Sequence, residues 1–318
     1  MASTEEASAH LHTHSSLLDR RTAARNAASL AATLAMTLAA GIASAQGTPA
    51  AEAAPAVSAV RIPAGSHYVA MGSSYAAGPG ITTVEPGTPP RCSRSVDNYA
   101  HQLARRRGLV LTDAGCSGAR TVHVLEAWDE LPAQVDALRP ETRLVTVTIG
   151  GNDLGYMQVL GGGACRGLGL TESGPGRPCP DVRAPADAEY EGVASRMRAI
   201  AAAVRARSPR AQLVFVDYIS VLPPDGVCEL APLGQADAAL ARQVDSRLRA
   251  VTAAAARDSG ALLLEASRLT RDHHACAADA WVNGFPRPDP QVPPVVVFHP
   301  KLAAMTAIAT ALDSMLPR

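Results

Sequence analysis

Two residues of the chain could act together as a nucleophile and a general base. Ser74 lies in the segment 72–78 (GSSYAAG), directly after an apolar run, and a serine at the end of a strand can face solvent and attack a substrate. The glycine before it permits a tight turn, and the small residues after it leave room for a bound ester. His299, followed by Pro300, stands where a loop should enter the last helix. Alone, a Gly-Ser-Ser segment is more often a turn than a nucleophile, and a lone histidine before proline is more often a surface or capping residue.

Two further glycine-containing segments could supply hydrogen-bond donors to a carbonyl oxygen. The segment 150–153 (GGND) presents Asn152, and the segment 116–119 (CSGA) presents the backbone N–H of Gly118. A donor aimed where negative charge develops can be worth ~3 kcal/mol of transition-state stabilisation. Glycine and asparagine are also the usual residues of polar turns, which is the alternative interpretation. Both segments are candidates for an oxyanion hole.

Short apolar runs must position these residues. They alternate with amphipathic stretches, which is typical of a parallel α/β sheet. Ligands of such sheets bind at the carboxyl ends of the strands, where the serine, glycine and asparagine segments lie. The predicted strands are 67–72, 108–115, 143–150, 211–219 and 261–267, and the predicted helical stretches are 97–107, 121–138, 187–207, 235–258 and 300–316.

Two segments interrupt this alternation and are predicted to be long loops, 160–186 with three consecutive glycines and 271–298 with five prolines. All six cysteines follow the first 90 residues, and no Cys-x-x-Cys occurs. An even number of cysteines in an exported chain favours three disulfides, although spacing alone does not choose the pairing. The cysteines are Cys92, Cys116, Cys165, Cys179, Cys228 and Cys276.

The first 45 residues have the three-part pattern of an export signal. Three arginines precede an apolar stretch at 27–40, and small residues at 43–45 (ASA) favour cleavage near Ala45. The apolar stretch is shorter than the ~20 residues of a spanning helix, which disfavours an uncleaved anchor. The twin-arginine and general secretory routes both remain open. We expect a signal peptide at 1–45, an Ala/Pro-rich flexible lead-in at 46–64 and a secreted domain at 65–318 without a transmembrane span.

Composition and missing motifs exclude several functions. Lys+Arg and Asp+Glu number 29 each, and no basic tract suggests nucleic-acid binding. The chain has no Gly-x-Ser-x-Gly, P-loop, dinucleotide-binding or zinc-peptidase motif. His273 and His274 near Cys276 could suggest a metal, but a disulfide would occupy that cysteine. We therefore expect no cofactor and no metal.

In their order along the chain, the serine, glycine, asparagine and histidine segments resemble the SGNH hydrolases, also called GDSL lipases and esterases. The resemblance rests on 72–78, 113–119, 150–153 and 299–300 and runs from about Tyr68 to the C-terminus. It implies a three-layer α/β/α sandwich with a five-stranded parallel sheet. It also implies Ser74 as nucleophile and His299 as base, with an oxyanion hole made by the N–H groups of Ser74 and Gly118 and the side chain of Asn152.

The secreted six-cysteine members of Streptomyces type resemble the chain most. In them neighbouring cysteines pair in sequence order, which implies Cys92–Cys116, Cys165–Cys179 and Cys228–Cys276. The resemblance implies hydrolysis of a small-molecule or lipid ester, and we expect the protein to be a monomer. Two alternatives stay open: an acetyl esterase acting on sugars, for which Trp128 and Trp281 are the only tryptophans, and a secreted binding module without activity.

The chain departs from the family pattern at two positions. Gly-Asp-Ser is replaced by Gly72-Ser73-Ser74, and the aspartate expected three residues before the histidine is replaced by Val296. Because 293–298 has no side-chain acceptor, and some Streptomyces-type relatives work with a Ser–His dyad, we predict that the carbonyl of Val296 accepts the hydrogen bond from His299 Nδ1. The rival acceptor is a carboxylate from the preceding loop, Asp289 first, then Asp279 or Asp272.

Overall fold

The computed structural model describes residues 58–174, 176–287, 291 and 295–317. The expected signal peptide and the lead-in up to residue 57 lie outside the described residues. The end of the expected lead-in is part of the packed structure. Ile62 is buried, and the Val60 N–H donates to the side chain of Gln212 at 3.1 Å.

A parallel sheet of five strands forms the centre of the domain, as the resemblance implied. Its order is β2-β1-β3-β6-β7, so the chain crosses from one side of β1 to the other after β2. β3 and β6 are central and nearly all their residues are buried, which explains why they are continuous apolar runs. The strands are β1 (His67–Gly72), β2 (Val110–Asp113), β3 (Thr142–Thr148), β6 (Gln212–Val216) and β7 (Leu262–Leu264).

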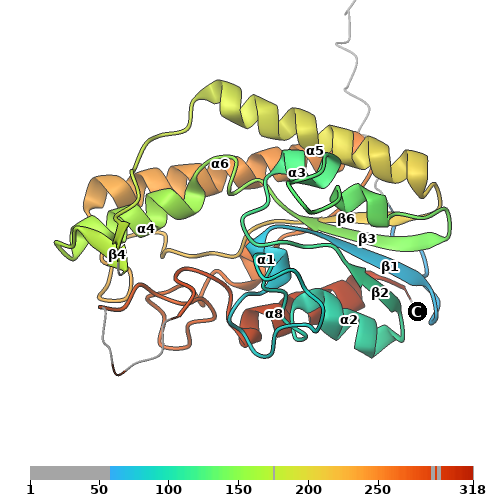
Figure 1. The fold of residues 1–318 in the computed structure, drawn as a ribbon, viewed down its shortest axis with the longest axis horizontal. Helices are drawn as coiled ribbons and strands as arrows, with labels where there is room; N and C mark the ends of the chain where they lie inside the picture. The colour runs from blue at the N-terminus through green and yellow to red at the C-terminus, as the bar shows by residue number, and fades with distance from the viewer. Residues whose placement is uncertain (1–57, 175, 288–290, 292–294, 318) are drawn as a thin grey trace, which may run out of the picture. The chain divides into compact units, whose positions relative to one another are not determined.

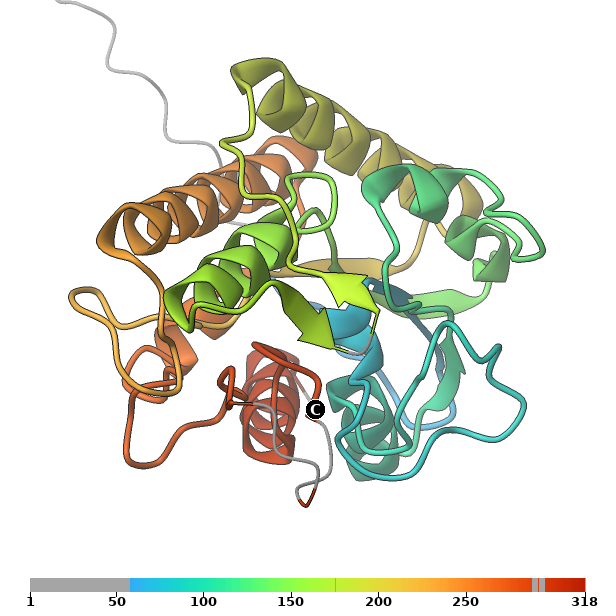
Figure 2. The ribbon, with the colours of Figure 1, turned by 60° about the vertical axis from the view of Figure 1, so that its left-hand side comes forward.

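Helices cover both faces of this sheet, which gives the three layers (Figures 1 and 2). One layer holds α3 (Thr121–Leu125), α4 (Tyr156–Gly167), α5 (Asp187–Arg207) and α6 (Gln235–Ser259). The opposite layer holds α2 (Tyr99–Arg107) and α8 (Leu302–Met315). The shorter elements are α1 (Ser74–Ala77), η1 (Gln134–Ala137), α7 (Ala266–Leu269) and a hairpin of β4 (Glu172–Gly174) and β5 (Arg177–Pro178).

The structure corrects two sequence predictions. The stretch 121–138 is not one helix, because α3 ends at Leu125 and η1 begins at Gln134. The supposed loop 160–186 begins inside a helix, since α4 includes all three consecutive glycines. A methyl group at Gly162 would collide with the carbonyl of Pro180, so the missing side chain lets the following segment pack directly on the helix.

Three disulfides are present, in the sequential pairing that the resemblance implied. Cys92–Cys116 joins the segment before α2 to the segment after β2, Cys165–Cys179 joins α4 to the segment after β5, and Cys228–Cys276 joins the two loops that follow β6 and α7. Among the helices of the described residues, none is both long and apolar enough to span a bilayer.

Candidate active site

Ser74 and His299 meet at the carboxyl end of β1. Gly72 ends the strand at φ +143°, and a side chain there would collide with the carbonyl of Thr148. The chain therefore turns sharply, and Ser74 becomes the first residue of α1. Its Oγ lies 2.8 Å from Nε2 of His299, although the two residues are 225 positions apart. This is the distance needed for proton transfer from a serine to an imidazole.

A backbone carbonyl orients the imidazole, but it is not the predicted one. His299 Nδ1 lies 2.8 Å from the carbonyl oxygen of Val297. A carbonyl can only accept, so Nδ1 carries the proton and Nε2 is left to accept from Ser74. The prediction of Val296 is wrong, because the Val296 carbonyl instead accepts from the Asn283 amide at 3.1 Å and from the His299 N–H at 3.3 Å.

The reason for this difference is the backbone at Phe298. Its φ of +55° is left-handed, which is uncommon for an aromatic residue. The resulting turn brings the carbonyl of Val297, two residues before the histidine, to the ring. Of the rival carboxylates, Asp279 instead accepts from the indole N–H of Trp281 at 3.0 Å. Asp289 lies outside the described residues.

The electrostatics of His299 favour a neutral base. Burial lowers the pKa of His299 below its ordinary value, and the hydrogen bond to the Val297 carbonyl partly opposes this effect. Within the described residues, no carboxylate forms an ion pair with the ring. The imidazole is therefore neutral at neutral pH and can accept a proton.

The three proposed oxyanion donors come from neighbouring strand ends. Ser74 begins a helix, so its N–H has no intrahelical acceptor. Gly118 has φ +82°, which suits a residue without a side chain. Asn152 donates one amide hydrogen to the carbonyl of Ala119 at 2.9 Å. A carboxamide has two N–H donors, so the second is left for a ligand.

A polar network, which was not predicted from the sequence, joins the loop that follows Gly118 to the loop that carries Asn152. Asp153 accepts from the N–H of Thr121 at 2.9 Å and from its hydroxyl at 2.5 Å. Arg196 on α5 donates to the Thr121 hydroxyl at 2.6 Å and to Asp153 at 3.3 Å. Asp153 follows Asn152 directly in the sequence and could have drawn attention to this network. The sequence does not show which residues Asp153 binds.

Ser73, which replaces the aspartate of the family pattern, is fully buried and shares a hydrogen bond of 2.9 Å with the hydroxyl of Tyr218. That hydroxyl also accepts from the N–H of Gly151 at 3.0 Å. Burial raises the pKa of Tyr218 to about 12, so it stays protonated. The two residues thus connect the nucleophile turn to the loop that carries Asn152.

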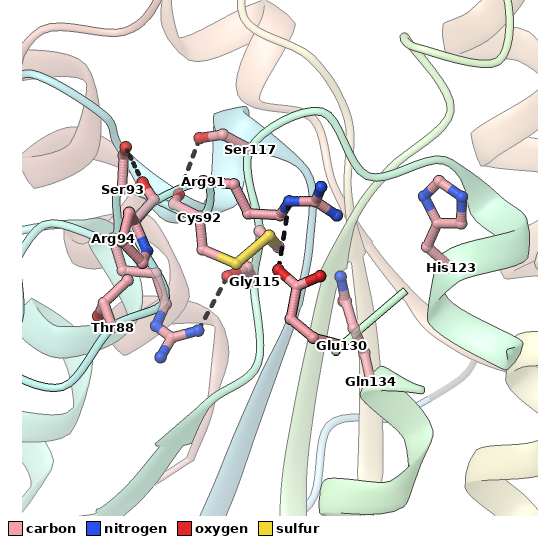
Figure 3. The surroundings of a disulfide bond; sticks show 12 residues. Thr88, Arg91, Cys92, Ser93, Arg94, Gly115, Ser117, His123, Glu130 and Gln134 are labelled. Carbon is pink, nitrogen blue, oxygen red and sulfur yellow. Dashed lines mark hydrogen bonds and ion pairs between the residues drawn. A yellow bond between two sulfur atoms is a disulfide. The ribbon is translucent and has the colours of Figure 1, made fainter. Parts of the chain in front are cut away.

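A pocket of about 340 Å³ lies beside the loop of Gly118. The Cys92–Cys116 disulfide and Trp128 line it, and the indole lies against Gly118. Figure 3 shows Arg91 and Glu130 next to this disulfide, with His123 opposite Cys92. Neither Ser74 nor His299 lines the pocket.

One group of potential metal ligands occurs among the described residues, formed by Glu85, His101 and Asp113. Arg94 already pairs with Glu85 at 2.8 Å, and Asp113 accepts from Asn98 at 2.7 Å. These partners already occupy both carboxylates. Cys276 is in a disulfide and is therefore no thiolate ligand beside His273 and His274.

Comparison with known proteins identifies relatives and a shared fold. Lipase 2 of Streptomyces coelicolor is 34% identical over 225 residues, which cover 68% of this chain and 75% of that protein. A lipase of Streptomyces rimosus is 30% identical over 245 residues, covering 74% and 82%. Phospholipase A1 of Streptomyces albidoflavus shares the fold, with a TM-score of 0.63 and 24% identity over 79% of this chain and 100% of that one. Since residues 70–307 also match the family model, the chain belongs to the GDSL-like lipase/acylhydrolase family.

Proposed function

We propose that the protein is a secreted serine hydrolase that cleaves carboxylic esters through an acyl-enzyme on Ser74, with His299 as base. The observation that carries this proposal is the distance of 2.8 Å between Ser74 Oγ and His299 Nε2, in the tautomer that leaves Nε2 as acceptor. Family membership and relatives that are named lipases support the same chemistry.

In the proposed reaction, Ser74 Oγ attacks the carbonyl carbon of the ester and its proton passes to His299 Nε2. The N–H groups of Ser74 and Gly118 and the amide of Asn152 stabilise the oxyanion. Collapse of the tetrahedral intermediate breaks the bond to the alcohol, which takes the proton from the imidazolium. Water then attacks the acyl-enzyme in the same way, with His299 again as base.

The proposed substrate is a lipid ester or a small ester. Lipase names among the relatives favour a fatty acyl group. Three disulfides fit an oxidising compartment outside the cytoplasm. Together with the export signal proposed at 1–45, they support secretion. We further propose that the protein acts as a monomer.

The test replaces Ser74 with alanine in the mature protein. Ser74→Ala should lower kcat for a short-chain p-nitrophenyl ester by about 10³-fold or more, since no acyl-enzyme can form. Ser73→Ala is the matched control, one residue away and also buried, and should retain far more activity. A panel with fatty esters, a phospholipid and an acetylated sugar then ranks the substrate classes. An active Ser74→Ala variant with an inactive Ser73→Ala variant would refute the assignment of Ser74.

A further inference from the structure

The residue that follows the nucleophile is hydrogen-bonded to the loop that carries the base. The hydroxyl of Tyr75 donates to the carbonyl oxygen of Phe298 at 2.5 Å, while Met157 Sδ lies 3.9 Å away. A hydroxyl has one proton, and the nearer carbonyl is the better acceptor. Tyr75 is only 2% exposed. Burial raises the pKa of Tyr75 well above its ordinary value, so the hydroxyl stays a donor.

Asn283 holds the same residue, Phe298, through its backbone N–H. The Phe298 N–H donates to the Asn283 carbonyl at 3.1 Å, and the Asn283 N–H donates to the His299 carbonyl at 2.9 Å. The Asn283 amide also donates to the Val296 carbonyl at 3.1 Å. Asn283 therefore binds the chain before, at and after Phe298.

These bonds surround a backbone conformation that would not persist without them. Phe298 has φ +55°, and a bulky residue in this region is retained only where its surroundings fix it. The turn at Phe298 is what places the Val297 carbonyl 2.8 Å from His299 Nδ1. Any relaxation at Phe298 would rotate that carbonyl away from the imidazole.

We propose that Tyr75 is a positioning residue of the Ser–His dyad: with Asn283 it holds the turn at Phe298, so that the Val297 carbonyl orients His299 in place of an aspartate. The inference rests on the proposed function of Ser74 and His299. Tyr75 suits this role because it follows Ser74 in α1. One short helix thus fixes both the nucleophile and the loop of its base.

The experiment compares two tyrosine-to-phenylalanine variants of the mature protein. Tyr75→Phe removes the bond to Phe298 and keeps the ring. Tyr68→Phe is the matched control, since Tyr68 is equally buried and its hydroxyl bonds to Thr146 at 2.7 Å, away from the dyad. Tyr75→Phe should lower kcat for a p-nitrophenyl ester roughly tenfold or more with a smaller change in KM. Tyr68→Phe should keep kcat within about twofold of the wild type.

Two further measurements separate positioning from general damage. Inactivation by a p-nitrophenyl phosphonate, which needs the same Ser–His pair, should slow in Tyr75→Phe in proportion to kcat. The ¹⁵N NMR signals of His299 should show the Nδ1–H tautomer in the wild type and a mixture in Tyr75→Phe. Urea unfolding should show similar losses of stability in both variants. Asn283→Ala, which loses the bond to Val296, should shift kcat and tautomer in the same direction.

The inference is overturned if Tyr75→Phe keeps wild-type kcat and tautomer, or if Tyr68→Phe loses as much activity. Failure of the proposed function has a different pattern: a wild-type protein without esterase activity, or a Ser74→Ala variant with full activity. The NMR comparison reads the tautomer without turnover, so it decides the positioning role of Tyr75 in that case as well.

Discussion

A single neutral carbonyl orients the ring of His299, whereas many serine hydrolases use a carboxylate for this purpose. The Val297 carbonyl fixes the tautomer, because it accepts from Nδ1 at 2.8 Å. It carries no full charge, so it stabilises the imidazolium less than an aspartate would. Burial further disfavours the charged ring and lowers its pKa. The ring of His299 should therefore stay neutral to a lower pH than an ordinary histidine.

The lowered pKa of His299 predicts the pH dependence of activity. Catalysis needs the neutral imidazole, so kcat/KM should be constant above the pKa of His299 and fall as the pH drops through it. Since burial lowers that pKa, the acidic limb should lie below pH ~6.5, the ordinary value for histidine. A pH profile of kcat/KM with a neutral ester measures the limb. A limb above pH ~6.5 that moves down in Asp289→Asn would instead identify a carboxylate partner.

The residues of the candidate site were predictable to different extents. Ser74 and His299 belong to short motifs at strand and loop ends, and the order of the motifs located them. The acceptor for Nδ1 was placed at Val296 instead of Val297. It depends on the left-handed turn at Phe298, and aromatic side chains rarely adopt that conformation. The roles of Tyr75 and Asn283, which hold this turn, likewise depend on three-dimensional contacts that the sequence does not show.

Among the elements, α4 shows how packing overrides local propensity. Three consecutive glycines disfavour a helix by up to ~1 kcal/mol each relative to alanine, so the segment was predicted to be a loop. Two of these glycines allow close contacts that the sequence does not reveal: Gly162 lies against Pro180 and Gly163 against Leu233. In contrast, α5 at Asp187–Arg207 has the predicted bounds, because its amphipathic pattern follows from its own residues.

Adjacent glycines of α4 give a matched pair of substitutions. At Gly161 the nearest atom to an added methyl group is a Pro180 ring carbon at 3.9 Å, an ordinary contact. Gly161→Ala should therefore raise the free energy of unfolding by up to ~1 kcal/mol through helix propensity. Gly162→Ala should lower it by ~1–3 kcal/mol, because the methyl group collides with the Pro180 backbone. Urea unfolding of both variants measures the difference, and equal effects would contradict the close packing at Gly162.

At the scale of the whole molecule, two carboxyl groups should make folding depend on pH. Asp217 follows β6 and is buried, and Asp245 lies on α6 with a side chain that is 14% exposed. Burial raises the pKa of Asp217 to about 6, against the hydrogen bonds from Ser267. Burial also raises the pKa of Asp245 on α6 to about 7, despite the opposing charge of Arg249. The like charge of Asp217 raises the pKa of Asp245 further. Both groups therefore bind protons more tightly in the folded state than in the unfolded state.

The sign of the effect follows from linkage. A carboxyl group with a raised pKa contributes stability below its unfolded pKa of ~4, and this contribution is lost as the pH rises through the folded value. For Asp217 and Asp245 the loss extends to pH values of about 6 and 7. The buried His299 acts in the opposite direction, since its lowered pKa costs stability as the pH falls below the unfolded value. The pH dependence of the wild-type stability is therefore a sum of opposing effects. A comparison of stability between variants is needed to isolate the carboxyl groups.

Asp245→Asn isolates the carboxylate contribution. The variant cannot ionise at this position, so its stability relative to the wild type should increase between pH 5 and pH 8, by on the order of 1 kcal/mol or more. Urea unfolding with the disulfides intact measures this difference, because urea is uncharged and does not screen the Arg249 pair. Asp258→Asn is the control on the same helix, since the Asp258 side chain is 41% exposed, and its difference from the wild type should not change with pH. If the Asp245→Asn difference is also constant, the carboxyl group is already ionised in the folded protein at pH 5, and the Arg249 charge outweighs burial.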